Sequence, residues 1–399
     1  MLEPLASVLL FTLAGLVTLF VLYYLVIGCL YFTVPEKPAR LSGFLKRFAV
    51  VIPAHNEGVM IRAALESWKR VQYPRVLFEI YVIADNCTDN TAEIARTHGA
   101  LCLERLDANK GKGQALAWAL QRLPLHEYDA VVFVDADCTV SAEFLAVMSE
   151  RLIGGAKVIQ GFDGILNPDD SMITRLMLIT NIMKNLLLSH SKSKLGLTVQ
   201  LMGTGMCFDR AILQQIAWKA FSVGEDLEQF AYLAEAGIQV EFEPRAAVYA
   251  QEATSLRQAY SQRVRWASSR MHVFGLGLRL LMKGLQQGDL RSADAAMNLL
   301  APNYSMLANI TAMGLAGCVA IQFPGRSFLI AWFVILVCAE VLYFVMGMAV
   351  SKLSSKIVFS LCFAPVFLIW KMGIDIIAVL SLRRSLWIRT PRTPHTNKQ

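Results

Sequence analysis

Apolar residues are concentrated in two blocks, one near each end of the chain. The first runs from Leu5 to Phe32 without an Asp, Glu, Lys or Arg, and the second extends over residues 304–382. A helix that crosses a bilayer needs about 20 predominantly apolar residues. We therefore expect an N-terminal membrane anchor and further membrane helices at residues 304–323 and 328–350.

A cleaved signal peptide is the alternative interpretation of the first block, and three features disfavour it. The chain starts Met-Leu-Glu-Pro with an acid and no basic residue, the apolar run is too long, and no cleavage site of small residues follows. Basic residues follow the block instead, namely Lys37, Arg40, Lys46 and Arg47. Because positively charged flanks stay in the cytoplasm, we expect an uncleaved anchor followed by a cytoplasmic domain.

The last apolar segment, residues 357–382, differs from the others because it contains Pro365, Lys371 and Asp375. Lys371 and Asp375 are four residues apart and can therefore pair on one face of a helix. If the two preceding helices cross the membrane, a third full crossing would place the basic tail, residues 383–399, outside the cytoplasm, against the positive-inside tendency. We expect this segment to bend at Pro365 and return, or to lie partly at the interface.

Between the apolar blocks, from about Phe48 to Ser269, the pattern is that of a water-soluble domain. Short apolar runs typical of buried strands alternate with segments of helical pattern. The runs cover residues 48–53, 78–85, 101–104 and 130–134, and the helical segments cover residues 61–71, 91–97 and 113–123. This alternation predicts an α/β fold with a Rossmann-like, mostly parallel sheet that helices cover on both faces.

Composition supports this division of the chain. Hydrophobic residues make up 55% of the 399 residues and charged residues 17%, which is too apolar for an ordinary soluble enzyme. The eight cysteines have no CxxC pair and no metal-type spacing with histidine, so we expect them to be reduced packing residues. The formal charge of +7 includes basic residues near the apolar segments, and anionic lipid headgroups explain these better than nucleic acid does.

Polar clusters stand where three of the predicted strands end, which is where parallel α/β sheets bind ligands. They are His55-Asn56-Glu57, Asp85-Asn86 and Asp135-Ala136-Asp137. In an extended chain Asp135 and Asp137 point to the same side, and two close carboxylates raise each other's pKa. A divalent cation would remove that cost, and Mg²⁺ accepts two carboxylates completed by waters and phosphate oxygens. A solvated turn or a helix cap is the plainer alternative for such a pair.

Two further segments have features suited to anions and sugars. The loop at residues 109–113, NKGKG, opens a predicted helix, where glycines, the helix N-terminus and Lys110 or Lys112 can meet a phosphate. Residues 262–266, QRVRW, offer a guanidinium for phosphate oxygens and an indole that can stack on a sugar ring. The alternatives are a flexible loop for the first segment and an amphipathic helix on the membrane for the second.

Two acids, Glu225 and Asp226, follow Gly224 and precede a segment of helical pattern. A carboxylate in a closed, partly apolar site can act as a general base. Asp226 is also well suited to cap the N-terminus of the helix that follows it. A turn of small residues at Gly203 to Gly205, followed by a strand-like run, completes the set of candidate segments.

Taken in order, six motifs resemble those of the membrane-embedded family 2 glycosyltransferases, which have the GT-A fold and include cellulose, chitin, hyaluronan and poly-N-acetylglucosamine synthases. The motifs are PAHNE (53–57), ADNCTDNT (84–91), VDADC (134–138), GTGMCF (203–208), GEDLE (224–228) and QRVRW (262–266). The resemblance covers residues 48–269 and the flanking membrane segments. It departs at residues 84–87, where the family often has Asp-Asp-Gly-Ser, and at Gly224, where the family has threonine.

The resemblance implies a role for each motif. The residues implied are Glu57 and Asp85 for the nucleotide base and ribose, Asp135 and Asp137 for the metal and diphosphate, Asp226 with Glu225 for deprotonating the acceptor hydroxyl, and Gln262, Arg265 and Trp266 for the diphosphate and acceptor sugar. Lys112, from the glycine-containing loop, joins the nucleotide-binding set. Gly203 to Gly205 would lie beside the acceptor.

The implied reaction is an inverting transfer that uses Mg²⁺ or Mn²⁺. The resemblance favours a synthase that extends a polysaccharide from UDP-GlcNAc or UDP-glucose. The alternative is the transfer of one sugar to a membrane lipid of ceramide or polyprenyl diphosphate type. A third interpretation, an inactive scaffold or sugar-nucleotide sensor, is disfavoured because the acids are retained. Expected partners are the nucleotide sugar, a glycan or lipid-linked acceptor, membrane lipids and candidate export or synthase proteins, without nucleic acid.

These expectations place the protein in the plasma (inner) membrane as a multi-pass protein with a cytoplasmic catalytic domain. The parts are an anchor at 1–35, the GT-A domain at 36–270, interfacial helices at 271–303, a membrane region at 304–382 and a basic cytoplasmic tail at 383–399. The interfacial assignment starts from residues 271–283, which are apolar on one side and carry His272, Arg279 and Lys283.

Overall fold

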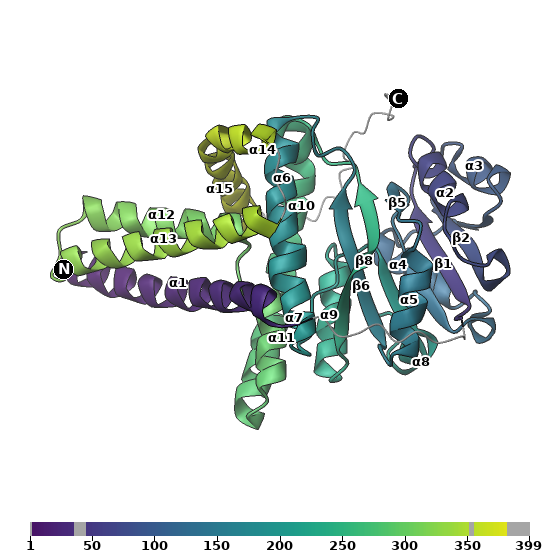
Figure 1. Cartoon of the computed structure of the whole chain (residues 1–399), viewed down its shortest axis with the longest axis horizontal. Helices are drawn as coiled ribbons and strands as arrows, with labels where there is room; N and C mark the ends of the chain where they lie inside the picture. Colours follow the sequence, from purple (N-terminus) through teal and green to yellow (C-terminus); the bar gives the residue numbers. More distant parts are fainter. Residues whose placement is uncertain (1, 36–44, 351–354, 381–399) are drawn as a thin grey trace.

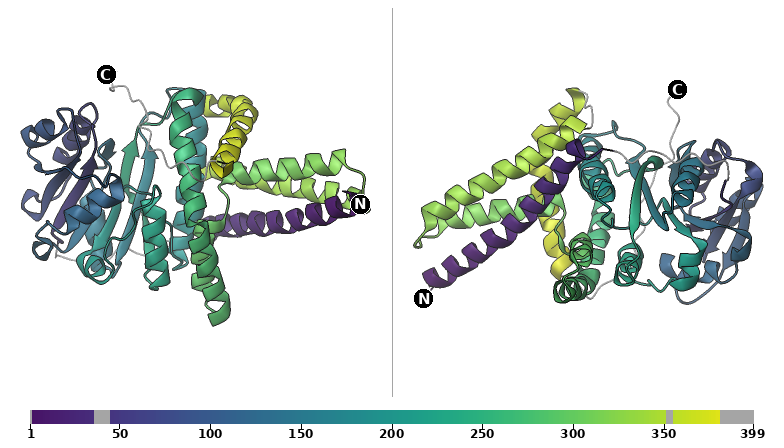
Figure 2. Two further views of the ribbon diagram at one scale, coloured as in Figure 1. Left: turned by 180° about the vertical axis from the view of Figure 1, so that it is seen from behind. Right: turned by 60° about the horizontal axis from the view of Figure 1, so that its bottom comes forward.

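The computed structural model describes residues 2–35, 45–350 and 355–380 of the chain. The expected tail at residues 383–399, together with Lys37 and Arg40, lies outside the described residues. Figures 1 and 2 show a sheet domain at one end of the molecule and three apolar helices at the other, with long helices crossing between them.

A mixed sheet forms the centre of the domain, and its eight strands in the described residues have the order β3-β2-β1-β4-β7-β6-β8-β5. The strands are β1 (Phe48–Ala54), β2 (Phe78–Asp85), β3 (Leu101–Arg105), β4 (Ala130–Phe133), β5 (Cys138–Val140), β6 (Val158–Ile165), β7 (Met206–Asp209) and β8 (Val240–Ala250). Strands β3, β2, β1 and β4 are parallel neighbours, β7 runs antiparallel to both β4 and β6, β6 is parallel to β8, and β5 is antiparallel to β8. The predicted α/β fold with a mostly parallel sheet is confirmed.

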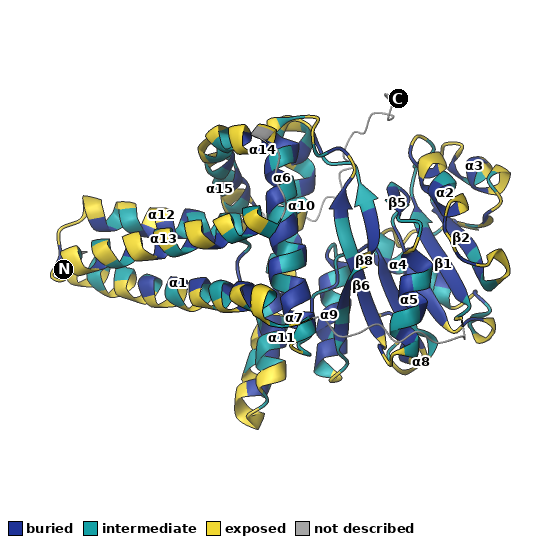
Figure 3. Ribbon diagram, viewed as in Figure 1, coloured by how far each residue is buried: buried dark blue, intermediate teal, exposed yellow. Residues whose placement is uncertain are grey.

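The parallel half of the sheet follows directly from the apolar pattern. Strands β1 and β4 are buried almost throughout, as near-continuous apolar runs require when helices cover both faces. Figure 3 shows β1 largely in the buried colour, with exposed residues on the outer helices. Helices α2 (Ile61–Lys69), α3 (Thr91–Thr97) and α4 (Lys112–Leu120) connect the strands within a few residues of the predicted positions.

The second half of the domain adds further helices. They are α5 (Phe144–Ile153), α6 (Met172–Ile182), a π-helical segment (Met183–His190), α7 (Ser191–Lys194), α8 (Arg210–Gln215), α9 (Glu225–Glu235), α10 (Leu256–Gln287) and α11 (Leu290–Leu300). Of these, α6, α10 and α11 lie between the sheet and the apolar helices (Figure 1). Helix α10 contains both the QRVRW motif and residues 271–283. The proposed boundary between catalytic domain and interfacial helices at residue 270 therefore falls within one continuous helix.

The apolar helices α1 (Leu2–Thr33), α12 (Tyr304–Ala320) and α13 (Arg326–Val350) lie side by side and extend away from the sheet (Figures 1 and 2). They pack through a shared apolar core that includes Val17 and Phe333, while large apolar side chains on their outer faces are exposed. By length and composition, three helices of the described residues could cross a membrane: Pro4–Thr33, Arg326–Val350 and Lys356–Leu380. Helix α12 is shorter than predicted because Pro324 and Gly325 follow it closely.

The last apolar segment is interrupted where a bend was predicted. Helix α14 (Ser355–Ser360) gives way to one 3₁₀ turn at Leu361–Phe363 before α15 (Ala364–Leu380), so the irregularity lies just before Pro365. Lys371 and Asp375 form the predicted ion pair along α15. Phe367 packs α15 against Met177 of α6, which brings this segment against the helices of the domain.

Candidate active site

The carboxyl ends of β1, β2 and β4 open into one cavity of about 1000 Å³. The residues to which the resemblance assigns catalytic, donor-binding or metal-binding roles all line this cavity: Glu57, Asp85, Lys112, Asp135, Asp137, Glu225, Asp226, Gln262, Arg265 and Trp266. The topology explains the convergence, because ligand sites in such sheets lie beyond the carboxyl ends of the strands. Helices α9 and α10 supply the opposite wall.

Two asparagines in the left-handed conformation turn the chain at the ends of β1 and β2. Asn56 has φ 56° and Asn86 has φ 51°, values that asparagine tolerates better than most residues. The turns bring Glu57 and Asp85 to the cavity. Asp85 is buried, and its Oδ1 forms an ion pair with Nη1 of Arg105, at the end of β3, at a distance of 2.6 Å. Arg105 belongs to none of the sequence motifs, yet this ion pair fixes the position of the Asp85 carboxylate.

The two aspartates after β4 are close enough to share a cation. Ligand atoms of Asp135, Asp137 and Cys138 all lie within 4.8 Å of one another, and the Asp135 N–H donates to Oγ1 of Thr204 at 3.1 Å. Burial raises the pKa of the Cys138 thiol, and the thiol donates to Asp137 at 3.4 Å. A neutral thiol is a poor ligand for a hard cation, so the two carboxylates fit Mg²⁺ or Mn²⁺ with oxygens supplied by a ligand and water.

Lys112 connects the aspartates to the acids of α9. Its Nζ lies 2.6 Å from Asp135 and 3.3 Å from Glu225, and it donates to the carbonyl oxygen of Gly203 at 2.6 Å. Burial lowers the pKa of Lys112, but the carboxylates of Asp135 and Glu225 outweigh burial, so the pKa is raised and the amine stays charged. Lys110, the other lysine of the predicted anion-binding loop, lines the same cavity.

Glu225 and Asp226 form the first turn of α9, whose N-cap is Gly224. Asp226 is therefore not the cap residue; its Oδ1 accepts from the N–H of Leu227 at 2.9 Å. Burial raises the pKa of Asp226, and burial together with the charge of Asp226 raises the pKa of Glu225 to about 7. Gly203, with φ +81°, faces Asp226, and a Cβ there would lie 3.4 Å from Oδ2. Because Gly203 has no side chain, the space in front of the Asp226 carboxylate stays open.

The QRVRW motif lies on the cavity face of α10. Gln262 is 7% exposed, and its Oε1 has no hydrogen-bond partner among the described residues. Among the residues that the structure describes, none forms an ion pair with the Arg265 side chain, so its guanidinium is available to a ligand. Trp266 is 45% exposed, and the guanidinium of Arg263 lies 4.4 Å from its ring while pairing with Glu252 at 2.7 Å. The predicted motif is a cavity wall as well as part of an amphipathic helix.

Two glycines in the motifs are required by close packing. A Cβ on Gly224 would lie 2.7 Å from Cβ of Ser269 on α10, which explains why threonine does not stand at this place in this chain. A Cβ on Gly113 would lie 2.0 Å from the carbonyl oxygen of Ala220. Gly113 therefore brings α4 against the segment before α9 and so helps to position Lys112.

The comparisons with known proteins agree with this geometry. The model of the family described as "Glycosyltransferase like family 2" matches residues 46–269. The "Probable glycosyltransferase YdaM" of Bacillus subtilis (strain 168) is 26% identical over 242 residues, which cover 57% of this chain and 56% of that protein. The "Beta-monoglucosyldiacylglycerol synthase" of Nostoc sp. (strain PCC 7120) is 25% identical over 239 residues, which cover 57% of this chain and 50% of that protein.

The chain thus spans about half the length of the curated relatives it matches. Among solved structures, the mannosyltransferase PcManGT from Pyrobaculum calidifontis, in complex with GDP-Man and Mn²⁺, superposes with a TM-score of 0.61 at 17% identity. The superposition covers 94% of this chain and 99% of that one. This similarity shows that the two proteins share a fold that includes the apolar helices.

Proposed function

The chain belongs to the family described as glycosyltransferase like family 2, and from that premise we propose that it transfers one sugar from a nucleoside diphosphate sugar to a membrane lipid. The proposal depends on the continuity of the cavity, because the carboxylates and the membrane helices line the same space. On the side away from the sheet its wall includes Tyr24 of α1, Tyr304 of α12 and Tyr343 of α13. An acceptor with an apolar tail can therefore reach Asp226 from the membrane.

This proposal reverses the order of the two functions expected from the sequence. A relative named for a glucosyl lipid product supports the lipid acceptor. Extension of a polysaccharide, the first expectation, would need a path for the polymer, and the described residues contain three helices long enough to cross a membrane. So few helices favour a single transfer at the membrane surface over export of a polymer by this chain alone.

We assign the donor to the sheet side of the cavity. Glu57 and Asp85 would contact the base and ribose, and Arg265 would contact the diphosphate. Asp135 and Asp137 would hold Mg²⁺ or Mn²⁺, which supplies positive charge that neutralises the leaving diphosphate. The complex of PcManGT with GDP-Man and Mn²⁺ supports a metal and a nucleotide sugar here. UDP-glucose and UDP-GlcNAc are the donors we propose for this chain.

Asp226 is placed to accept the proton of the acceptor hydroxyl. The hydroxyl oxygen attacks the anomeric carbon on the side opposite the diphosphate, so the configuration is inverted. Because burial raises its pKa, Asp226 is a stronger base than an exposed aspartate. Lys112 and Arg265 provide fixed positive charge near the diphosphate, where negative charge develops as the bond breaks, and such charge is often the largest catalytic contribution.

We also propose that the sheet domain is cytoplasmic and that the chain crosses the plasma (inner) membrane more than once. The basic residues Lys46 and Arg47, between α1 and β1, support this orientation. The domain division at 1–35, 36–270, 271–303 and 304–382 stays a proposal, with α10 continuous across its second boundary.

The proposed function predicts a product of one sugar per lipid. Purified full-length protein in lipid nanodiscs would be incubated with radiolabelled UDP-glucose or UDP-GlcNAc and Mn²⁺, and the products separated by thin-layer and size-exclusion chromatography. We expect label in a lipid that carries a single sugar. A long labelled polymer would instead support polysaccharide synthesis and its export or synthase partners, and would contradict the single transfer.

Activity should rise with pH through about 7. Below this pH the buried pair Glu225 and Asp226, which faces Lys112 and Asp135, holds an additional proton and cannot accept one from the acceptor. The value of kcat/KM, measured from pH 5 to 9, should therefore fall toward acid. Glu225→Gln removes a negative charge beside Asp226, which lowers the pKa of Asp226 and moves the fall to lower pH.

The control for this pH profile is Glu235→Gln, at the other end of α9, which should leave the profile in place. A profile that Glu225→Gln does not shift would show that the acid pair does not control the reaction.

A further inference from the structure

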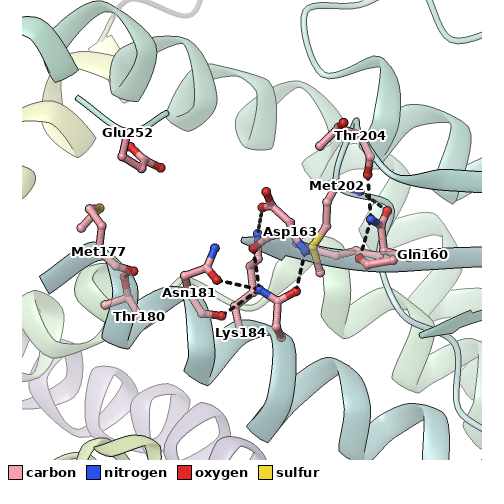
Figure 4. A network of polar contacts seen from close by, with 12 residues as sticks. Gln160, Asp163, Met177, Thr180, Asn181, Lys184, Met202, Thr204 and Glu252 are labelled. Atoms are coloured by element: carbon pink, nitrogen blue, oxygen red, sulfur yellow. Dashed lines mark hydrogen bonds and ion pairs between the residues drawn. The ribbon is translucent and has the colours of Figure 1, made fainter. Parts of the chain in front are cut away.

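A polar cluster outside all the sequence motifs lines the membrane side of the cavity. It consists of Asp163 on β6, Asn181 at the end of α6, Lys184 in the π-helical segment and Glu252 after β8. Figure 4 shows these side chains around one open space. We propose that this polar cluster binds the head of the acceptor lipid and selects a neutral head that bears one or more hydroxyl groups, such as the glycerol of a diacylglycerol or a sugar. This inference rests on the proposed function.

The cluster is held in place by a buried amide. Asn185 is fully buried; its Oδ1 accepts from the N–H of Asp163 at 3.2 Å, and its Nδ2 donates to the carbonyl oxygen of Asp163 at 3.1 Å. Nδ2 also donates to the backbone oxygen of Asn181 at 2.9 Å. The backbone of β6 is thereby fixed to α6, while the charged ends of Asp163 and Lys184, 2.9 Å apart, remain partly exposed to the cavity.

Two irregular segments aim the cluster at the cavity. The register between β6 and β8 shifts between Gly161 and Phe162, just before Asp163, and such irregularities often re-aim a side chain near a site. The π-helical segment Met183–His190 begins just before Lys184, and π-helical turns are rare and are frequently found at functional sites. Both irregularities meet at the Asp163–Lys184 pair, which supports a binding role for it.

The charges of this wall favour a neutral head over a phosphate. Lys184 pairs with Asp163, Arg263 pairs with Glu252 at 2.7 Å, and Lys371 pairs with Asp375. A phosphorylated head would have to displace a carboxylate from one of these cations. Hydroxyl groups can instead donate to the carboxylates and accept from the lysine without separating either ion pair.

Arg270 is a further cation on this side, and both of its terminal nitrogens already donate to the protein; Nη2 donates to Oε1 of Gln200 at 3.5 Å. Its Nη1 donates to the carbonyl oxygens of Asn298 and Ala301, at 3.3 and 2.9 Å. Buried Oε1 atoms of Gln251 and Gln262, which line the same cavity, have no partner among the described residues. Unpartnered acceptors require a ligand that donates, which a hydroxyl can do and an ionised phosphate cannot.

The test measures acceptor and donor constants separately. Full-length protein in detergent micelles would receive labelled UDP-sugar and one of three acceptors: a diacylglycerol, a monohexosyl diacylglycerol or a polyprenyl phosphate. We expect the wild type to glycosylate the neutral lipids. Asn181→Leu and Lys184→Met should each raise the KM for the neutral acceptor at least about tenfold, the effect of losing one good hydrogen bond. The KM for the donor should change much less.

Asp163→Asn keeps the shape of the side chain and therefore guards against a folding artefact. It should raise the KM for the neutral acceptor by a smaller factor. Lys69→Met, which breaks an exposed pair with Glu66 far from the cavity, is the matched control and should change neither constant. The inference is overturned if only the polyprenyl phosphate is glycosylated, or if the variants raise the donor KM as much as the acceptor KM. Transfer to no acceptor, with no donor consumed, would overturn the proposed function itself.

Discussion

Asp226→Asn should nearly abolish sugar transfer while leaving the nucleotide bound. We expect kcat to fall by about 10²–10⁴-fold, the usual contribution of a general base. The substitution keeps the size of the side chain and an oxygen that can accept from the N–H of Leu227, so the first turn of α9 should be preserved. Removing a carboxylate from the cavity also reduces repulsion of a diphosphate, so the affinity for UDP should be unchanged or slightly higher.

Two measurements separate this role from a structural one. Initial rates of label transfer give kcat, and calorimetric titration with UDP and Mn²⁺ gives the nucleotide affinity. Glu93→Gln, on the exposed face of α3, is the control for loss of an acid elsewhere and should behave as wild type. Normal turnover by Asp226→Asn together with a large loss in Glu225→Gln would transfer the role of base to Glu225.

The part of the fold that the sequence predicted is the part whose pattern is set by burial alone. Strands β1, β2 and β4 are apolar runs because helices cover both faces, and each ends at a polar cluster that the cavity then gathers. In β8 the pattern is different: Glu243 alternates with apolar residues and pairs with Arg245 and Arg151. Glu243 is neutralised by ion pairs with arginines, one of them from helix α5, so the local sequence pattern did not predict this strand.

The sequence pointed to many of the residues that line the cavity, but not to the contacts among them. Lys112 was expected to meet a phosphate, yet its contacts with Asp135 and Glu225 join segments that are far apart in the sequence. Arg105 and the Asp163–Lys184 pair belong to no motif, and only the topology places them at the cavity. The amphipathic pattern of α10 fitted two predictions, a helix at the membrane surface and a wall of the cavity. In the structure, residues of α10 line the cavity.

Removal of divalent cations should stop transfer, and Asp137→Asn should weaken the cation site. We expect a chelator to abolish label transfer and added Mn²⁺ or Mg²⁺ to restore it. Asp137→Asn should raise the Mn²⁺ concentration that gives half-maximal activity by at least about tenfold to a hundredfold, the effect of disturbing even the surroundings of a metal ligand. Asp169→Asn, an exposed acid paired with Arg175 outside the site, should leave the requirement unchanged.

Binding must be measured as well as activity, because a chelator could act elsewhere in a membrane preparation. The fraction of free Mn²⁺, measured by electron paramagnetic resonance, reports binding to the protein with and without UDP. We expect the wild type to bind Mn²⁺ much more tightly with UDP present, since two carboxylates leave most of the coordination shell to water and diphosphate oxygens. Asp137→Asn should lose most of this UDP-dependent binding.

The charges in the cavity explain why a cation is expected although Lys112 already contacts Asp135. Asp135, Glu225 and Asp226 lie around the ammonium group of Lys112, Asp137 lines the same cavity, and a nucleoside diphosphate would add further negative charge. Lys110, Lys112 and Arg265 line this part of the cavity and supply three positive charges, fewer than the four carboxylates and the diphosphate require. If transfer continued in a chelator and UDP did not tighten Mn²⁺ binding, these basic residues alone would neutralise the diphosphate. The metal assignment would then be wrong, and Lys112→Met would be the variant that loses transfer.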